Sequence, residues 1–165
     1  MKMSNRSAAL ISAAVLLLGG CGANGSEIAE SSAEVQSAAA VDAAQLLDGI
    51  NEEKLDGKLF SGEEKFDSNA AKFYGTDSIE DGGILYNTEG CYADEVSAVR
   101  FSEGTDGAAL LKTRLEDRTA TFRDYRPEEL DKLKKARVIS VGGYDILIIS
   151  DNADGIEKQL RESLG

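Results

Sequence analysis

Apolar residues recur at helical spacing in several stretches of the chain. Asp42 and Gln45 stand three positions apart, as in a capping box, and apolar residues follow at steps of three and four. This pattern predicts a first helix over residues 42–54. Apolar spacing predicts two further helices, over 106–122 and 154–165. Gly75 closes a predicted helical turn at 68–74, and Pro127 opens a short helix over 127–135.

Two of these helices carry more detailed signals. In the helix expected over 106–122, apolar residues at steps of three, four and seven share one face, and the opposite face is that of a solvated surface. We assign four charged residues to that outer face, Lys112, Arg114, Glu116 and Asp117. Asp154 and Glu157 have the spacing of a second capping box, which places the start of the last helix at Asp154.

Short apolar runs that flank turn residues predict two β-hairpins. In the first, 84–86 and 95–101 flank a turn at 87–90, and residues 55–60 add a short extended piece upstream. In the second, 137–141 and 144–150 flank Gly142-Gly143, whose glycines supply the positive φ angles of a primed turn. Residues 146–149 are apolar without alternation, which favours a strand in the middle of a sheet.

The two hairpins are each followed by a helix, and the connecting segments 101–107 and 149–155 align without a gap. A repeated hairpin-plus-helix unit predicts an α+β fold with a four-stranded antiparallel sheet (ββα-ββα), helices on one face, and the N-terminal helix in front. Seven aligned positions are few, so ordinary loop chemistry is the alternative explanation of the match.

The first twenty residues have the layout of a secretion signal. Lys2 and Arg6 precede an apolar centre at 8–18 that is shorter than the roughly 20 residues of a membrane span. Residues 18–21, Leu-Gly-Gly-Cys, have the form of a lipobox with Cys21 as the acylated residue. The alternatives are a permanent transmembrane anchor and a chance cysteine after an ordinary signal. The pattern thus divides the chain into a signal peptide at 1–20, a disordered Gly/Ser/Ala/Glu tether at 21–40 and one acidic domain at 41–165.

Composition narrows the function classes. Without residues 1–20 the chain keeps 16 cationic and 30 acidic side chains, a formal charge of −14, which argues against nucleic acid as a partner. The chain has no histidine, which excludes His-dependent triads and most zinc sites. With Cys21 acylated, Cys91 has no disulfide partner, and we interpret it as a small residue beside a turn, with a reactive or intermolecular thiol as the alternative.

Candidate chemistry is sparse. Ser150, Asn152 and Asp154 occupy the first ligand positions of an EF-hand-like pattern, but Arg161 stands where a bidentate glutamate is needed, so helix capping explains these side chains better. The chain shows no phosphate-binding loop and no nucleophile elbow, and we therefore expect no catalytic, cofactor-binding or metal-ligating residues.

The residues after the first hairpin turn are the best candidates for recognition. Tyr92, Asp94 and Glu95 place an aromatic ring and two carboxylates beside a turn, where they can contact a partner or ligand. The alternatives are that the tyrosines cap a small core and that Glu95 pairs with Arg100 or Arg123.

The order of these features resembles the domain-of-unknown-function 4358 family of Gram-positive bacterial lipoproteins. The segments that carry the resemblance are 18–21, 93–99, 111–122, 125–129 and 144–151. The resemblance implies an uncharacterised extracytoplasmic lipoprotein and supplies no catalytic residues.

The leading functional hypothesis is a non-enzymatic binding or accessory module of the cell envelope, held at the cell membrane by lipid on Cys21 and facing outward. Its expected partner is another envelope protein or a peptide, and no cofactor is expected. One alternative is a cation- or small-ligand-binding protein that uses the acidic loops near Asp151 or Asp94. Another is an envelope enzyme that depends on carboxylates or serine.

Overall fold

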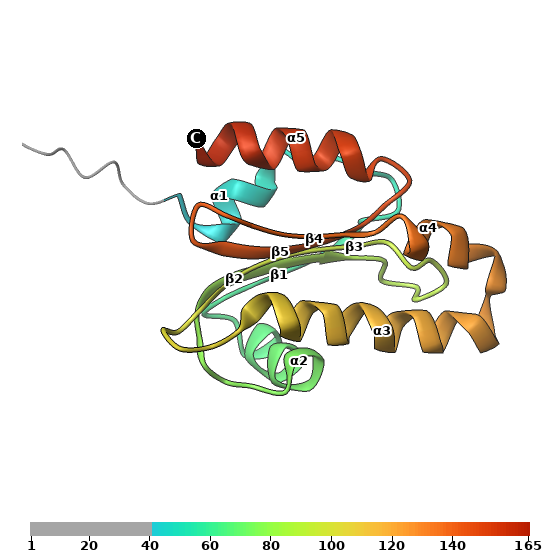
Figure 1. Cartoon of the computed structure of the whole chain (residues 1–165), viewed down its shortest axis with the longest axis horizontal. Helices are drawn as coiled ribbons and strands as arrows, with labels where there is room; N and C mark the ends of the chain where they lie inside the picture. Colours follow the sequence, from blue (N-terminus) through green and yellow to red (C-terminus); the bar gives the residue numbers. More distant parts are fainter. Residues whose placement is uncertain (1–40) are drawn as a thin grey trace, which may run out of the picture. The chain divides into compact units, whose positions relative to one another are not determined.

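The computed structural model describes residues 41–165, and the expected signal peptide, lipobox and tether lie outside the described residues. The described part is α+β, with an antiparallel sheet in the order β1-β2-β3-β5-β4 (Figure 1). The strands are β1 Gly57–Phe60, β2 Ile79–Tyr86, β3 Glu95–Phe101, β4 Arg137–Val141 and β5 Tyr144–Ile149. The helices are α1 Ala43–Asp48, α2 Glu64–Tyr74, α3 Gly107–Tyr125, the 3₁₀ turn η1 Pro127–Glu129, α4 Leu130–Lys134 and α5 Ala153–Leu164.

Local signals in the sequence place several helix and turn boundaries correctly, although α1 ends at Asp48 rather than at 54 and α2 begins at Glu64 rather than at 68. Asp42 accepts a hydrogen bond from the Gln45 N–H at 2.7 Å, and Asp106 accepts one from Ala109 N–H at 3.0 Å, so both aspartates cap their helices. Gly75 ends α2 in the left-handed conformation, with φ of 67°. The Gly142-Gly143 turn of the β4–β5 hairpin has positive φ at both residues, 58° and 81°.

The sheet has five strands, and the expectation of four was wrong. The extended piece at 55–60 contains β1, which pairs with β2 in the register Gly57↔Tyr86 to Phe60↔Gly83. β2 begins at Ile79, earlier than predicted, and so offers a longer edge for pairing. The hydrophobic pattern of one strand cannot reveal this pairing, because the ladder joins backbone groups that are 23 to 29 positions apart in the chain.

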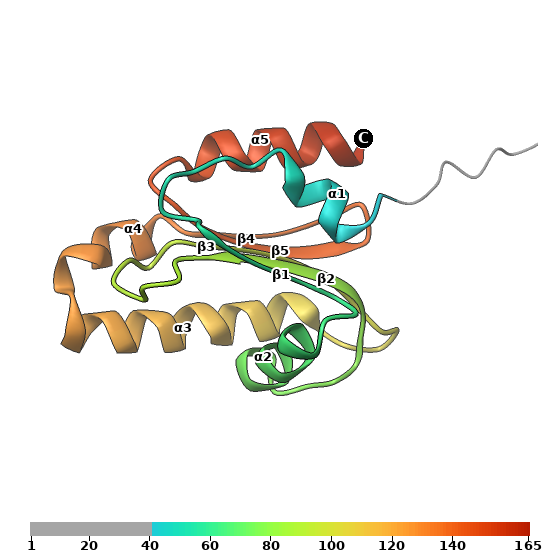
Figure 2. The same ribbon diagram turned by 180° about the vertical axis from the view of Figure 1, so that it is seen from behind.

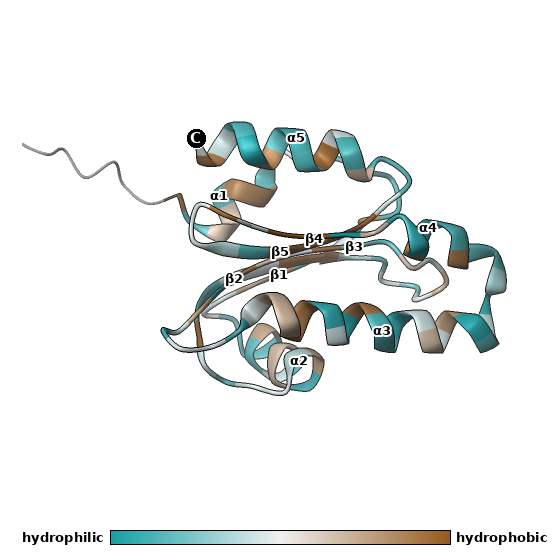
Figure 3. Cartoon of the chain, viewed as in Figure 1, coloured by the Kyte–Doolittle hydropathy of each residue, from teal (hydrophilic) through white to brown (hydrophobic). Residues whose placement is uncertain are grey.

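Helices cover both faces of the sheet, where the sequence predicted one face only (Figures 1 and 2). α1 and α5 pack with Ile146 and Ile148 of β5 in one core. α2, α3 and α4 pack with Leu147 and Ile149 in the other. Because successive strand residues point to opposite faces, the unbroken apolar run of β5 supplies both cores. Coloured by hydropathy, the strands are mainly brown and the outer sides of α3 and α5 mainly teal (Figure 3).

Two adjacent glycines in β2 allow helices to approach closely from both sides. A Cβ atom on Gly82 would lie 2.6 Å from the ring of Phe66 on α2. A Cβ on Gly83 would lie 2.8 Å from Leu47 of α1. Contacts this short are essentially never made by real Cβ atoms, so a side chain at either glycine would force Phe66 or Leu47 to shift.

The two hairpin-plus-helix units are present in the expected order, but they are not equivalent in space. β3 and β5 are antiparallel neighbours, and a twofold axis relating them would stand perpendicular to the sheet. Such an axis would keep α3 and α5 on the same face, whereas they lie on opposite faces. The start of α5 also differs from the prediction, because Asn152 is its N-cap and Asp154 pairs with Arg137 at 2.8 Å instead of capping.

Candidate functional site

The three residues singled out from the sequence lie in and just before β3, and they do not form one site. Asp94 and Glu95 are almost completely buried, with 3% and 1% of their surface exposed, whereas Tyr92 is half-buried. As neighbours in an extended segment, Asp94 and Glu95 point in opposite directions. Asp94 joins a lysine on α4, and Glu95 joins two arginines on α3.

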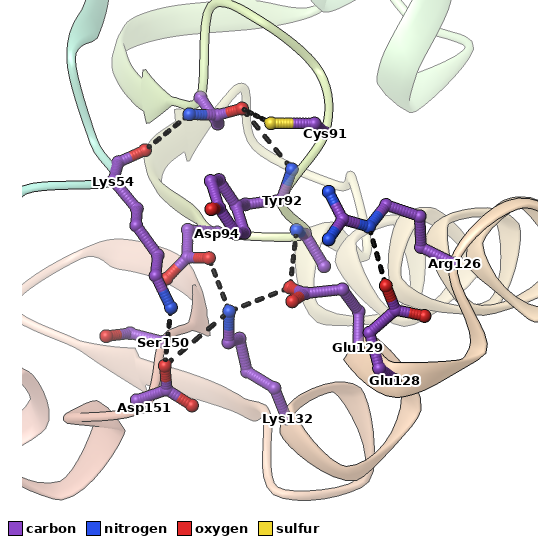
Figure 4. A network of polar contacts seen from close by, with 12 residues as sticks. Lys54, Cys91, Tyr92, Asp94, Arg126, Glu128, Glu129, Lys132, Ser150 and Asp151 are labelled. Atoms are coloured by element: carbon purple, nitrogen blue, oxygen red, sulfur yellow. Dashed lines mark hydrogen bonds and ion pairs between the residues drawn. The ribbon is translucent and has the colours of Figure 1, made fainter.

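The Tyr92 loop is held by Asn87 at the end of β2. The Asn87 side chain accepts a hydrogen bond from the Tyr92 N–H at 3.3 Å and donates one to the Lys54 carbonyl at 3.2 Å. Three cations surround the Tyr92 ring, with Lys54 at 4.9 Å, Arg126 at 5.3 Å and Lys132 at 5.8 Å from its centroid (Figure 4). Cations near an aromatic face are attracted by its quadrupole, so the ring is fixed between basic side chains.

Lys132 is the centre of the first buried cluster (Figure 4). Its Nζ lies 2.5 Å from Asp94 Oδ2 and 2.8 Å from Glu129 Oε2, and 3.7 Å from the more exposed Asp151. Glu129 also accepts the N–H of Ala93 at 2.9 Å. These contacts join α4, the start of β3 and the segment after β5, three parts of the chain that are far apart in sequence.

The charges in this cluster stabilise one another. Burial raises the pKa of Glu129, but the Ala93 N–H and the Lys132 ammonium outweigh it, and the pKa lies below the usual 4.5. Burial lowers the pKa of Lys132, but Asp94 and Glu129 hold it above its usual 10.5. Lys132, Asp94 and Glu129 therefore form an ion-paired set. The Lys132 ammonium lies between the two carboxylates and takes the place that a bound cation would occupy.

Cys91, the free thiol of the described chain, lies beside this loop and is half-buried. Its Sγ is 3.5 Å from Glu89 Oε2 and 3.7 Å from Asn87 Oδ1. Burial raises the pKa of the Cys91 thiol, and the hydrogen bond and charge of Glu89 raise it further. A raised pKa keeps sulfur in the less nucleophilic thiol form.

Glu95 forms the second buried cluster, with Arg114 and Arg118 of α3. Arg114 donates from Nε and Nη2 to the two Glu95 oxygens, at 3.2 and 2.7 Å, and Arg118 Nε lies 3.5 Å from Oε2. The Ser97 hydroxyl donates to Glu95 Oε1 at 3.1 Å. The Arg114 guanidinium also lies 3.7 Å from the centroid of the Phe73 ring on α2.

Two expectations are thereby corrected. Glu95 pairs with Arg114 and Arg118 rather than with Arg100 or Arg123, and Arg100 instead lies over the Tyr144 ring at 4.5 Å. Arg114 was assigned to the outer face of its helix, but its side chain is only 13% exposed and points to the sheet. The long aliphatic stem lets an arginine occupy a position in the apolar stripe and still reach a carboxylate.

Four residues of these clusters were missed from the sequence: Arg114, Arg118, Glu129 and Lys132. For the arginines a signal exists, because positions 114 and 118 follow Leu111 at steps of three and seven, on the same stripe as Phe122. Charged residues on the apolar stripe of a helix indicate buried partners. Glu129 and Lys132 stand three apart on η1 and α4, a spacing too common in helices to point to burial.

Acidic groups in residues 41–165 do not gather into a metal site, since no three His, Cys, Asp or Glu side chains of that part come close enough to hold an ion. The EF-hand-like residues separate: Asn152 donates to Glu52 at 2.9 Å, while Asp154 turns to Arg137. Over the same residues, no helix combines the length and the apolar character needed to cross a bilayer. The position predicted to be lipidated, Cys21, lies outside the described residues.

Comparison with known proteins gives no relative. No protein family, no curated protein and no solved structure matches the chain.

Proposed function

We propose that the protein is a lipid-anchored, extracytoplasmic binding or accessory module of the cell envelope, without enzymatic activity, related to the domain-of-unknown-function 4358 lipoproteins. The lipobox ending at Cys21 supports the anchor, and the composition of 21–40 supports a flexible spacer. The buried carboxylates Asp94, Glu95 and Glu129 each contact a basic side chain, as structural ion pairs do, which supports a role other than catalysis by a free carboxylate.

The binding role is carried by three residues that we group as one aromatic and basic surface, Tyr92, Tyr125 and Arg126. Tyr125 is 64% exposed, the one large hydrophobic side chain with such exposure in residues 41–165. Its neighbour Arg126 lies 5.3 Å from the Tyr92 ring. Tyrosine and arginine are the residues most enriched at the energetic centres of protein interfaces.

Two residues of this surface, Tyr92 and Arg126, are held in place before any partner arrives. Asn87 fixes the backbone of Tyr92, and Glu129 fixes that of Ala93. Glu128 holds the Arg126 guanidinium at 2.9 Å. A surface that is already ordered loses less conformational entropy on binding, so the buried Lys132 cluster supports recognition indirectly.

The binding role is tested by site-specific photo-crosslinking in the native envelope. A photoreactive phenylalanine analogue replaces Tyr125 in the full-length protein, and the matched control carries it at Lys158, an exposed position of α5. We expect a discrete adduct from position 125 that disappears in the Tyr92→Ala background, and none from position 158. Adducts of equal yield at both positions, or at neither, would overturn the proposal.

The anchor has its own test. Metabolic labelling with a palmitate analogue should mark the wild-type protein, and Cys21→Ser should abolish both the label and the retention of the protein in the membrane fraction. Cys91→Ser is the matched control and should keep both. A Cys21→Ser protein that is still labelled would contradict lipidation at this residue.

A further inference from the structure

A small cavity lies next to the second buried cluster, on the face of the sheet that α2 and α3 cover. Its volume is about 120 Å³, and its lining includes Phe73 and Asn69 of α2, Tyr86 of β2, and both arginines that contact Glu95. None of Tyr92, Tyr125 and Arg126 lines this cavity, although Asn87 and Arg118, which do line it, both hydrogen-bond the Tyr92 backbone.

The charges around the cavity do not balance. Arg114 and Arg118 carry two positive charges, and among residues 41–165 Glu95, which also lines the cavity, is the one carboxylate at ion-pair distance from them. Asp94 and Glu129 act on Arg118 from farther away, so the surplus of one positive charge holds for the groups in direct contact. A buried cationic surplus attracts a monovalent anion, because opposite charges interact more strongly where water is excluded.

The arginines also keep hydrogen-bond donors that the protein does not use. Arg118 donates from Nη2 to the Tyr92 carbonyl at 3.3 Å, but its Nε is buried and has no hydrogen-bond acceptor in residues 41–165, where Glu95 Oε2 at 3.5 Å forms an ion pair with it. Burial lowers the pKa of Arg118 more than the charge of Glu95 raises it. A buried donor without an acceptor is uncommon in native proteins and indicates a missing partner.

We infer that the cavity binds a small carboxylate, which takes the N–H donors of Arg114 and Arg118 that Glu95 leaves free. Guanidinium groups match the planar geometry of a carboxylate through paired N–H donors. The aromatic rings of Phe73 and Tyr86 offer walls for a short carbon chain. A cavity of about 120 Å³ has room for a carboxylate of two or three carbons.

The carboxylate can belong to a free short-chain acid or to the C-terminus of a peptide. Both present the same planar group with one negative charge, which matches the surplus of one positive charge. A phosphate at neutral pH carries closer to two negative charges. Together with Glu95 it would exceed the two positive charges of Arg114 and Arg118.

The test follows the Nε–H resonances of the arginines by NMR while the full-length protein, in detergent, is titrated at neutral pH. Sodium propionate is the probe, and sodium chloride at equal ionic strength is the reference. We expect a saturable shift of the Arg118 Nε–H signal with a dissociation constant of about 1 mM. A shift equal to that in sodium chloride, or tighter binding of inorganic phosphate than of propionate, would overturn the inference.

Two variants make the test specific. Arg118→Lys keeps the charge but loses the planar donor pair, and we expect propionate to bind about tenfold more weakly. Arg161→Lys, on α5 at the opposite face, is the matched control and should bind as the wild type does. Asn69→Phe obstructs the cavity and leaves both arginines in place, so it should abolish the shift of Arg118. Unchanged binding in Arg118→Lys and Asn69→Phe would overturn the assignment of the cavity.

The source of the carboxylate is resolved by a tripeptide with a free C-terminus and the same peptide amidated. Binding of the free peptide about tenfold more tightly than propionate would identify a peptide end as the ligand. Equal or weaker binding of the free peptide would identify a short-chain acid. Equal binding of the amidated peptide would overturn recognition of a carboxylate.

Discussion

Asp94 and Glu95 are adjacent, acidic and equally buried, yet they belong to clusters of opposite character. Asp94 shares one lysine with Glu129 and Asp151, so its cluster has more carboxylates than cations. Glu95 is shared by two arginines, so its cluster has more cations than carboxylates. The difference comes from the helix that each carboxylate faces. α4 supplies one lysine to Asp94, whereas α3 supplies two arginines, one turn apart, to Glu95.

The two clusters differ in where their extra charged group lies, and this difference indicates what each cluster does. In the Lys132 cluster the ammonium contacts both buried carboxylates, and the third acid, Asp151, is exposed to water and pairs with Lys54 at 2.9 Å. In the Glu95 cluster the extra cation is buried, keeps an unused donor and lies beside a cavity. The Lys132 cluster therefore suits a structural role that holds elements together, and the Glu95 cluster suits the binding of an anion.

The largest expected effect comes from neutralising Glu95. Glu95→Gln leaves two buried guanidinium groups with no counter-charge, and we expect the free energy of unfolding to fall by about 3–5 kcal/mol, measured by urea denaturation. Glu89→Gln, at an exposed position of the β2–β3 loop, is the matched control and should change it little. A loss below about 1 kcal/mol for Glu95→Gln would show that the arginines do not depend on this carboxylate.

Removing the lysine should have a similar but somewhat smaller effect at neutral pH. Lys132→Met leaves Asp94 and Glu129 buried without their cation, and we expect a loss of about 3 kcal/mol. Because unpaired buried carboxylates take up protons more readily, the deficit relative to the wild type should shrink as the pH falls. Lys134→Met, 70% exposed on the same helix, is the control. A deficit that does not change with pH would contradict the ion-paired state of the cluster.

A smaller effect is expected when one of the several carboxylates around the lysine is neutralised. Asp94→Asn leaves Lys132 with Glu129 and Asp151, so we expect a loss of about 1–2 kcal/mol. Asp131→Asn, on the exposed side of α4, is the control. If Asp94→Asn cost as much as Glu95→Gln, the proposed contrast between a shared and an unshared counter-charge would be wrong.

The smallest effect is the pH dependence that Glu129 confers. The pKa of Glu129 is lower in the folded protein than its usual 4.5, so the folded state holds the proton less tightly than the unfolded state does. Its contribution to stability is therefore complete above about pH 4.5 and is lost as the pH falls through the folded pKa. The urea midpoint of the wild type should drop over this range, and Glu129→Gln should make the drop shallower.

Signals that act within a few residues were predicted well from the sequence. The helix caps at Asp42 and Asp106, the end of α2 at Gly75 and the β4–β5 turn all depend on hydrogen bonds or φ angles inside one short segment. The α+β class follows from the same local patterns. The second capping box failed because Arg137, distant in sequence, offered Asp154 an ion pair that competed with the cap.

The candidate site was predicted only in part. Tyr92, Asp94 and Glu95 are indeed set beside a turn, but the sequence could not show that Asp94 faces Lys132, 38 residues away, or that Glu95 faces Arg114, 19 residues away. These partners are decided by which helix covers which face of the sheet. The apolar run 146–149 already indicated that helices cover both faces of the sheet, since a strand that is apolar on both sides must be covered on both.

The sequence by itself therefore determined the local elements, their order and the acidic character of the domain, because these depend on near neighbours and on composition. The tertiary structure alone decided the fifth strand, the placement of helices on both faces and the separation of two adjacent carboxylates into unlike clusters. The physical reason is that strand pairing and buried ion pairs join residues far apart in the chain, whose partners are chosen by the packing of the whole sheet.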